Sequence, residues 1–333
     1  MNYTAFVGID VSKKTIDAYL VNAQDEKGTH HQFDNTSKGF TQLFRWIVKN
    51  KHALSQTFFC MEHTGIYALP LACELDAKAL IYCMEMPLHI KNSMGIRRGK
   101  SDKADSKVIA LYALSNYRKL RTNNLPAKEL LKIKNLLAFR ERLMKASQSL
   151  KQSCGELEKF SDKELQLMIP SESRKVIIYL EKKIDKVDTL IEKVIRSVAE
   201  LEKNYDLLQS ISGIGMRIAA NLLVTTHNFT RFENWRQYSS YAGTAPFEFT
   251  SGTSIKRKNK VSPLANKEMK RLLTLGAWTS MRGDRELRQF FERKVAEGKP
   301  KLSALNAVKN KLISRIFAVV KRGTPFVKLP MMG

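Results

Sequence analysis

The fold is indicated first by a stretch near the N-terminus, Val7-Gly8-Ile9-Asp10-Val11-Ser12-Lys13. Its apolar run ends on Asp10, which is the pattern of a short buried strand with an acid at its end. The alternating segment from Thr15 to Val21 predicts a second strand. A turn signal at Asp25-Glu26-Lys27-Gly28 precedes a third candidate strand near His31 to Phe33. Together these segments predict three strands joined as hairpins.

Helical and strand patterns alternate after these strands. Ser37 to Lys49 carries apolar residues at helical spacing. Thr57 to Met61 is a compact apolar strand that ends on Glu62, and Ala79 to Met84 is another strand candidate. Three hairpin strands followed by strands alternating with helices is the order of a ribonuclease-H-like sheet. We therefore predict an α/β domain over residues 1–125.

The middle of the chain, residues 126–205, is predicted to be helical. Pro170 is expected to break it, because proline removes a backbone donor and clashes with the preceding turn. The apolar residues on both sides of Pro170 follow the spacing of a coiled-coil seam. The partner of the second helix is either the helix before Pro170 or another subunit. The seam comprises Leu136, Leu143, Leu150 and Leu157, then Ile177, Leu180, Ile184, Val187, Ile191, Val194, Val198 and Leu201.

The remaining part, residues 206–333, is predicted to be mostly α. It opens with Ser210-Ile211-Ser212-Gly213-Ile214-Gly215, which indicates a helix-hairpin-helix-like segment. The N-terminal N–H groups of the second helix, beside Gly213 and Gly215, offer a phosphate site that reads no bases. The alternative is that the two glycines only permit a tight turn between helices.

Composition restricts the function classes. The 333 residues include 57 Lys and Arg against 32 Asp and Glu, a net charge of +25. Such an excess favours DNA or RNA as a partner, and a merely basic soluble protein is the alternative. A membrane partner is not expected, because no run of about 18 apolar residues exists to span a bilayer. A signal peptide is not expected at the beginning of the chain, because Asp10 interrupts any apolar segment.

The four cysteines argue against a zinc site or a disulfide framework, because none forms a C-x-x-C pair and no histidine cluster accompanies them. They are expected to be small apolar residues in a reducing cytoplasm. They are Cys60, Cys73, Cys83 and Cys154.

Four acids form the candidate catalytic site. Asp10 and Glu62 end strands, while Asp102 and Asp105 lie in Ser101-Asp102-Lys103-Ala104-Asp105, which is predicted to begin a helix with Ser101 as its N-cap. A spacing of three places both aspartates on one helix face. Carboxylates are ligands for Mg²⁺ or Mn²⁺. Two such ions about 4 Å apart stabilise the attacking and leaving oxygens of phosphoryl transfer.

Each acid also has an ordinary interpretation. An aspartate after a strand is often a turn residue, Asp102 can complement the helix dipole, and Asp105 can lie on a solvated face. The same segment is crowded with cations that either pair with the acids or hold the phosphates being cut. These cations are Arg97, Arg98, Lys100 and Lys103.

In its motifs the chain resembles the DEDD insertion-sequence transposases, which include the RNA-guided bridge recombinases and the Piv-type invertases. The resemblance covers nearly the whole chain in the right order. It rests on G-I-D-x-S-K from Gly8, E-H-T-G-x-Y from Glu62, S-D-x-x-D-S from Ser101, Gly213-Ile214-Gly215, Tyr241-Ala242-Gly243-Thr244-Ala245-Pro246, Thr250-Ser251-Gly252-Thr253-Ser254 and Arg322-Gly323-Thr324-Pro325-Phe326.

The resemblance implies a RuvC-like N-terminal domain, a coiled coil, and a C-terminal transposase domain with a nucleophilic serine. The metal-binding acids would be Asp10, Glu62, Asp102 and Asp105, and the nucleophile would be Ser251. It further implies a covalent phosphoserine-DNA intermediate, strand exchange between donor and target duplexes, and guidance by a noncoding RNA. A dimer or tetramer organised by the coiled coil is expected, in the bacterial cytoplasm and associated with the nucleoid.

From the residues alone, Ser251 is one of two equal candidates with Ser254. A serine hydroxyl needs a metal or a base to activate it, and the basic run Lys256-Arg257-Lys258-Asn259-Lys260 beside it could hold the scissile phosphate. The alternative is an exposed Ser-Gly turn. The chain departs from many relatives at Ala265, where they have a glycine.

Three other functions compete with a recombinase. A junction-resolving endonuclease would use the same acids with water as nucleophile, without Ser251. A nucleic-acid-binding protein with a degenerate site would need none of them. An actin-like nucleotide-binding domain also opens with G-I-D-x-S, but no second glycine-rich phosphate loop follows in this sequence.

Overall fold

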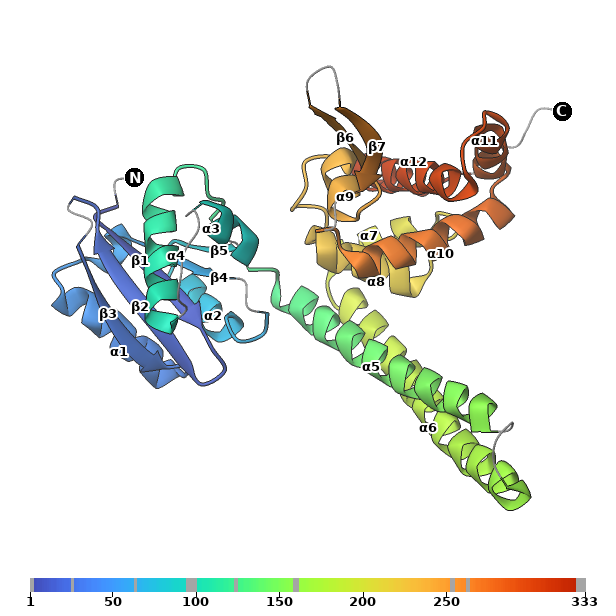
Figure 1. The fold of residues 1–333 in the computed structure, drawn as a ribbon, viewed down its shortest axis with the longest axis horizontal. Coiled ribbons are helices and arrows are strands. Elements are labelled where there is room, and N and C mark those ends of the chain that lie inside the picture. The colour runs from blue at the N-terminus through green and yellow to red at the C-terminus, as the bar shows by residue number, and fades with distance from the viewer. Residues whose placement is uncertain are drawn as a thin grey trace. The chain divides into compact units, whose positions relative to one another are not determined.

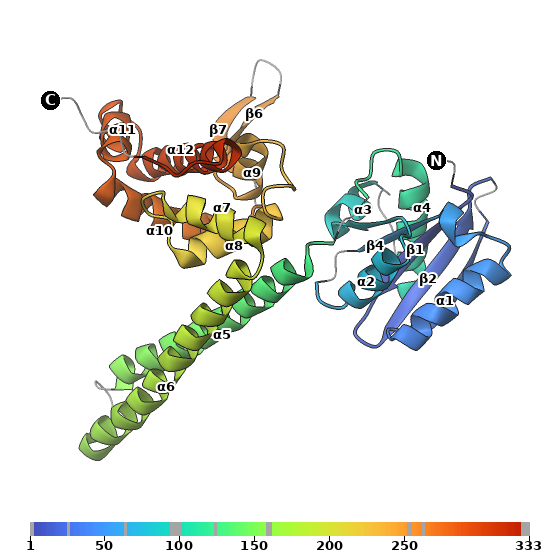
Figure 2. The same ribbon diagram turned by 180° about the vertical axis from the view of Figure 1, so that it is seen from behind.

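The computed structural model describes residues 3–24, 27–62, 65–93, 101–122, 125–157, 162–251, 255–261 and 264–327; residues 156–157, 247–251 and 255–260 are described by their main chain only. The chain divides into two compact units, Met1–Leu125 and Pro126–Gly333, each with its own core (Figures 1 and 2).

The N-terminal unit is built on a mixed five-stranded sheet of order β3-β2-β1-β4-β5. The first three strands are antiparallel to one another, whereas β1, β4 and β5 run parallel. This is the predicted order, three hairpin strands and then strands joined through helices. The strands are β1 (Ala5–Val11), β2 (Thr15–Asn22), β3 (Gly28–Asp34), β4 (Thr57–Glu62) and β5 (Tyr82–Glu85).

Helices cover both faces of this sheet (Figures 1 and 2). The odd-numbered residues of β1, such as Val7 and Ile9, pack in one core with α1 and α2. The even-numbered Phe6 packs on the other face with α4. Because both faces are buried, β1 is apolar throughout until Asp10. The helices are α1 (Ser37–Lys49), η1 (Leu54–Gln56), α2 (Leu69–Ala77), α3 (Pro87–Ser93) and α4 (Asp102–Asn116).

Gly8 lets the backbones of β1 and α4 meet. A Cβ atom at Gly8 would lie 2.1 Å from the Ala110 backbone nitrogen and 2.3 Å from the Ser106 carbonyl oxygen. Only glycine fits so close an approach. Side chains on a strand alternate between its faces, so Asp10 lies on the same face as Gly8. The close contact therefore fixes α4 over the end of β1.

The C-terminal unit begins with two long helices that pack along each other, α5 (Lys128–Leu157) and α6 (Lys163–Arg196). Their direction is antiparallel, since Arg140 pairs with Asp188 and Lys151 with Glu181. The predicted apolar seam is buried in the C-terminal half of α6, at Ile184, Val187 and Ile191. The partner left open by the sequence is thus α5 of the same chain.

The expected break at Pro170 is wrong, because α6 runs straight through it. A proline inside a helix removes one backbone hydrogen bond and costs about 3 kcal/mol. The 34-residue helix has many other turns, an N-cap at Asp162 that accepts from Glu164, and the packing with α5 to offset that loss.

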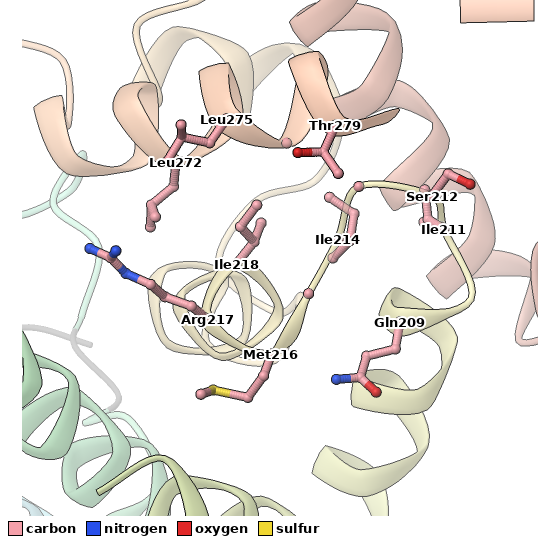
Figure 3. Close-up of a pocket in the computed structure, with 13 residues that line it drawn as sticks. Gln209, Ile211, Ser212, Ile214, Met216, Arg217, Ile218, Leu272, Leu275 and Thr279 are labelled. Carbon is pink, nitrogen blue, oxygen red and sulfur yellow. The ribbon is translucent and has the colours of Figure 1, made fainter. Parts of the chain in front are cut away.

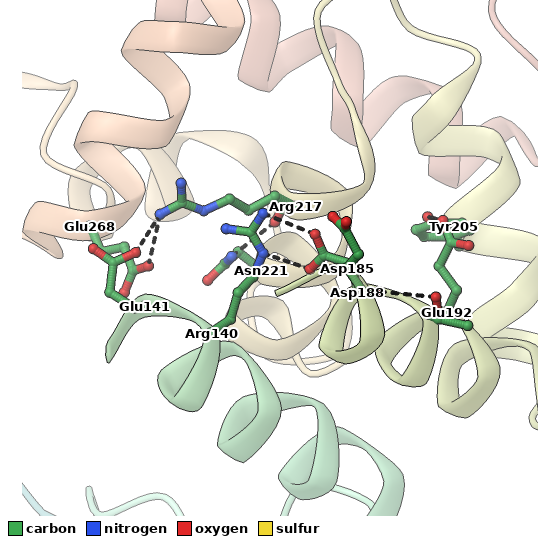
Figure 4. A network of polar contacts seen from close by, with 10 residues as sticks. Arg140, Glu141, Asp185, Asp188, Glu192, Tyr205, Arg217, Asn221 and Glu268 are labelled. Atoms are coloured by element: carbon green, nitrogen blue, oxygen red, sulfur yellow. Dashed lines mark hydrogen bonds and ion pairs between the residues drawn. The ribbon is translucent and has the colours of Figure 1, made fainter. Parts of the chain in front are cut away.

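Ion pairs join α5 and α6 to each other and to the rest of the unit (Figure 4). Arg140 binds Asp188 with two hydrogen bonds, of 2.6 and 2.9 Å. Glu141 on α5 accepts from Arg217 at 2.6 Å and from Arg271 at 3.2 Å. Glu141, a charged residue of α5, thus holds this helix against two further helices, α8 and α10.

The remainder of the unit is a helical core interrupted by one hairpin, β6–β7. The prediction of a mostly helical C-terminal part is confirmed, but the hairpin was missed. Among the described residues no helix is long and apolar enough to cross a membrane. The elements are α7 (Ala199–Gln209), α8 (Met216–Thr226), α9 (Trp235–Tyr241), β6 (Pro246–Ser251), β7 (Ile255–Val261), α10 (Lys267–Gly283), α11 (Arg285–Ala296) and α12 (Lys301–Arg322).

The cysteines are free thiols. Cys60 and Cys83 are buried on the neighbouring strands β4 and β5, with their sulfur atoms 3.3 Å apart. These two occupy core positions, as expected of small apolar residues, whereas Cys73 is exposed and Cys154 is half-buried.

Candidate active site at the acidic edge of the sheet

Four neighbouring strands each place one acid at the same level of the sheet. Asp10 on β1 lies opposite Asp17 on β2, and Glu62 on β4 lies opposite Glu85 on β5. The two halves of the row meet because β1 and β4 pair in parallel up to Ile9 and Met61, the residues just before Asp10 and Glu62. This row, Asp17-Asp10-Glu62-Glu85, is the acidic edge.

Helix α4 brings two more acids to the acidic edge. The Ser101 side chain caps the helix by accepting from the Ala104 N–H at 3.2 Å, as predicted. Asp102 and Asp105 occupy the first turn. Both lie near enough to Asp10 to act on it electrostatically. The structure therefore brings together the four acids selected from the sequence, from three elements distant along the chain.

The pKa of Asp10 is raised from 3.8 to about 6. Partial burial is the largest cause, because desolvation disfavours the charged carboxylate. The negative charges of Glu62, Asp102, Asp105 and Asp17 follow in that order. Asp10 thus sits in a pocket of excess negative charge, which a cation would relieve.

The outer acids of the edge have partners of their own. Asp17, which is 5% exposed, lies 2.8 Å from His30 Nε2 and accepts from Gln32 at 3.0 Å. Glu85 lies 2.8 Å from His89 Nδ1. These contacts satisfy the two ends of the row.

The donor set fits a hard divalent cation, since carboxylate oxygens are the ligands that Mg²⁺ and Mn²⁺ prefer. Within the described ranges, no three His, Cys, Asp or Glu side chains are already closed around one point that could hold a metal. The acids are nevertheless gathered at one edge of the sheet.

Several predicted neighbours of the acids lie outside the described residues. They are Arg97, Arg98 and Lys100. Lys103 is described, on α4 between the two aspartates. The expectation that the first three cations hold either phosphates or carboxylates therefore remains a prediction.

Ser251 is the last residue of β6, opposite Ile255 on β7. Its main chain is described and its side chain is not, while Gly252 and Ser254 lie outside the described residues. The sequence indicated only a polar stretch here. The signal that could have revealed strands is the alternation Phe247-Glu248-Phe249, which has the period of a strand.

The foot of this hairpin is fixed by hydrogen bonds to α12. The Thr244 carbonyl oxygen accepts from Asn306 at 2.5 Å and Asn310 at 2.9 Å, and the Thr244 hydroxyl donates to Asn310 at 2.7 Å. Gly243 just before it adopts φ +68°, which favours glycine. The Tyr241–Pro246 motif thus has a structural role, anchoring the strand that ends on Ser251.

The glycine loop between α7 and α8 lines a cavity of about 580 Å³ (Figure 3). Gly213 adopts φ +86°, and a Cβ there would lie 2.4 Å from the Gly276 carbonyl oxygen of α10, so the turn and close packing account for this glycine. Gly215 is exposed, with open space around its missing side chain. The lining is largely apolar, and its cation, Arg217, is paired with Glu141. Phosphate binding by this loop stays a prediction.

Two family models match the chain in succession. The first, a transposase model of the DEDD type named for IS110, matches residues 7–157, and the second, described as the transposase IS116/IS110/IS902 family, matches residues 205–292. Together they cover more than two thirds of the chain, and both describe enzymes that move DNA segments. The chain belongs to the IS110 family of transposases.

Similar proteins agree with this family. The pilin gene-inverting proteins of Moraxella lacunata and Moraxella bovis are each 27% identical over 330 residues, 97% of this chain and 98% of theirs. An uncharacterized IS110 protein of Streptomyces coelicolor is 35% identical over 134 residues, 40% of this chain and 33% of its own.

Solved structures of RuvC from Thermus thermophilus also match. The first covers 36% of this chain and 99% of its own at 11% identity, with a TM-score of 0.27, and the second is a complex with a Holliday junction substrate, at 10% identity and the same TM-score. A TM-score this low does not by itself establish a common fold.

The sequence reasoning missed the outer acids of the edge, Asp17 and Glu85. Asp17 is an acid on the alternating strand β2, and Glu85 ends a strand as Glu62 does. The same strand-end criterion that selected Glu62 could have found Glu85. Asp17 needed the strand register, because nothing local places it opposite Asp10.

Proposed function

We propose that this transposase is a DNA recombinase whose metal site is formed by Asp10, Glu62, Asp102 and Asp105. The observation that carries the proposal is the gathering of these four acids, which raises the pKa of Asp10 to about 6. Burial and the negative charges of Glu62, Asp102 and Asp105 all oppose ionisation of Asp10. Proteins maintain such unfavourable charge chiefly at functional sites.

Mg²⁺ or Mn²⁺ is the proposed cofactor, and when bound it would stabilise charge on the reacting phosphate and its leaving oxygen. Asp10 and Glu62, fixed at strand ends, would hold it from the sheet. Asp102 and Asp105 would close the site from α4, whose position is set by its contact with Gly8. His30, Gln32 and His89 bind the outer acids and so would keep Asp17 and Glu85 from competing for it.

Ser251 is the proposed nucleophile. Its hydroxyl oxygen would form a bond to the scissile phosphorus while the bond from phosphorus to one deoxyribose oxygen breaks. The serine proton leaves through a base, and the departing oxygen gains a proton to become a hydroxyl. The energy of the broken phosphodiester bond is thereby conserved in the new bond between serine and phosphate. This bond permits strand exchange in place of hydrolysis.

The wider assembly follows from the resemblance given above. We propose that donor and target duplexes are the substrates, that a noncoding bridge RNA guides the enzyme, and that α5 and α6 form a coiled coil that organises a dimer or tetramer. Residues 1–125, 126–205 and 206–333 would act as catalytic, coiled-coil and transposase parts, in the bacterial cytoplasm at the nucleoid.

The serine and the acids are tested separately. Ser251→Ala, Ser254→Ala and Asp10→Ala are incubated with element-end DNA and Mg²⁺, quenched in denaturant, and examined for protein-linked DNA and for recombinant product. We expect no adduct from Ser251→Ala, normal adduct from Ser254→Ala, and neither product from Asp10→Ala.

Different failures have different meanings. A persistent adduct in Ser251→Ala contradicts the serine assignment. Unchanged recombination by Asp10→Ala contradicts the metal site. Cleavage without any adduct in the wild type favours the junction-resolving endonuclease, in which water attacks the phosphate.

RNA guidance has its own test. The protein is purified from cells that express the whole element, and the RNA that accompanies it is sequenced. RNA from the element's end is expected, and its removal should abolish recombination. If none is recovered, guidance is excluded while the recombinase remains.

A further inference from the structure

A buried lysine on α12 has no acidic partner among the residues that the structure describes. Lys309 is 5% exposed. Its ammonium group lies 3.4 Å from the Thr274 hydroxyl of α10. In the part of the chain that the structure describes, no carboxylate lies within ion-pair distance of Lys309, whereas Lys311 and Arg315 on the same helix both have one.

The hydrogen-bond geometry leaves this ammonium group incomplete. The Thr274 hydroxyl already donates its proton to the Lys270 carbonyl oxygen at 2.8 Å, so it can only accept from Lys309. Among the described residues Thr274 is its one acceptor. Two of its three N–H bonds therefore point to no protein acceptor there.

A second lysine, Lys270 on α10, lies near enough to Lys309 to act on it electrostatically. Burial and the positive charge of Lys270 lower the pKa of Lys309 to about 8. Lys270 is half-buried on α10 and forms no ion pair with a described residue. Two neighbouring positive charges repel each other, and an anion bound to both would relieve that repulsion.

This lysine pair lies at the foot of the β6–β7 hairpin. The Lys270 side chain passes close to Gly243, where a Cβ atom would be 3.6 Å from Lys270 Cδ. Asn310, the residue after Lys309, holds Thr244 at the beginning of the hairpin. The pair is thus attached to the same anchor as the strand that ends on Ser251.

We propose that Lys270 and Lys309 form a subsite for one phosphodiester of a nucleic-acid backbone at the foot of the β6–β7 hairpin. A phosphate oxygen supplies the acceptors and the negative charge that the two ammonium groups lack. DNA and RNA share this group. The inference deepens the proposed function, since it requires that the chain bind nucleic acid.

The subsite makes a prediction that a structural lysine would not. A buried charge without a partner destabilises the free protein, and an apolar residue of similar length removes that penalty. Lys309→Met should therefore raise the melting temperature of the free protein while it weakens nucleic-acid binding. A lysine retained for packing would give a lower melting temperature and unchanged binding.

The test measures binding of a short DNA duplex and of a single-stranded RNA by fluorescence anisotropy across a salt series. The proteins are wild type, Lys309→Met, Lys270→Gln and the control Lys301→Met, which removes an exposed lysine from the same helix. For Lys309→Met we expect the salt slope to fall by about 0.9 with duplex DNA or about 0.7 with single-stranded RNA, and affinity to fall several-fold. Lys270→Gln should show a similar loss of slope.

The outcomes separate the claims. A smaller slope with DNA only, RNA only or both supports the subsite and identifies its ligand. The subsite is overturned if Lys309→Met and Lys270→Gln show a salt slope no lower than that of Lys301→Met. This holds even if the melting temperature of Lys309→Met rises. Should Lys309→Met fail to fold, Lys270→Gln alone decides. A wild type that binds neither nucleic acid overturns the proposed function as well, whereas normal binding by all variants overturns only the subsite.

Discussion

At the scale of single residues, the candidate site is defined by the different surroundings of similar acids. Asp17 is held by His30 and Gln32, while Asp10 is surrounded by other acids. Adjacent aspartates in one sheet thus have different electrostatic roles. The difference is set by neighbours from β3 and α4, and it has consequences for stability that can be measured.

The first prediction concerns Asp10 and pH. Its pKa is about 6 in the folded protein against 3.8 for the free group, so the folded state holds this proton more tightly than the unfolded state. The contribution of Asp10 to the free energy of unfolding therefore falls as pH rises from about 4 to about 6. Above this range, ionised Asp10 should destabilise the metal-free protein by about 1 kcal/mol, allowing for solvent screening.

The measurement is thermal unfolding with a chelator present. Asp10→Asn should melt above the wild type at about pH 7.5 and match it below about pH 4. Added Mg²⁺ should raise the wild-type melting temperature at neutral pH and have little effect on the variant. Equal melting temperatures of Asp10→Asn and the wild type at every pH would show that the charge of Asp10 does not affect stability.

The second prediction concerns Gly8. In Gly8→Ala the new Cβ would meet the backbone of Ala110 and Ser106. Backbone cannot yield as a side chain does, so we expect a loss of about 1–3 kcal/mol in the free energy of unfolding, measured by urea denaturation. Because α4 must move, Mg²⁺-dependent activity should fall more than stability does.

The control for Gly8→Ala is Gly155→Ala in α5, where a Cβ meets nothing within 4 Å. In this control the free energy of unfolding should stay level or increase. Equal stability of the two variants would contradict the close contact.

At the scale of elements, the helical pair α5–α6 depends on packing and on a few well-placed charges. Helix α6 continues through Pro170 although the local rule predicts a break. Its C-terminal half is fixed to α5 by Arg140 and Asp188, whose side chains are 14% and 23% exposed. The pair Lys151–Glu181, at 55% and 50%, lies further along the same two helices and is solvated.

The third prediction compares these two pairs. Asp188→Ala leaves the Arg140 guanidinium largely buried without its bidentate acceptor, so we expect a loss of about 3 kcal/mol. Glu181→Ala breaks an exposed pair and should change stability by about 0.5 kcal/mol or less. Urea denaturation of the full chain measures both. Similar losses from the two variants would show that burial does not set the strength of these contacts.

At the scale of the whole molecule, the N-terminal unit has cores of its own. The clusters on both faces of its sheet contain only residues from this unit. Leu125, its last residue, packs against one of them. The acidic edge is likewise complete within Met1–Leu125.

The fourth prediction is that residues 1–125 fold without the rest of the chain. We expect a cooperative thermal transition and dispersed amide signals in NMR spectra, since the fragment retains its cores. The fragment should also show the Mg²⁺-dependent stabilisation described for Asp10. A fragment that is unfolded, or that folds without responding to Mg²⁺, would show that the site needs the second unit.

The sequence alone indicated much of the architecture and most of the candidate site. Strand periodicity predicted the succession of strands and helices along the chain, and Ser101 marked the start of α4, because both signals are local. The strand-end position of Asp10 and Glu62 and the spacing of Asp102 and Asp105 were local as well. Ser251 came from a resemblance of motifs, and its role remains a prediction.

The tertiary structure decided what depends on register and on contacts between distant segments. Register places Asp17 opposite Asp10, packing carries α6 past Pro170, and the meeting of α10 with α12 buries Lys309 beside Lys270. None of these follows from local pattern, because charge repulsion and burial depend on neighbours brought together only by folding. The stretch from Val7 to Lys13 predicted that Asp10 ends a strand. Only the folded chain surrounds Asp10 with other acids.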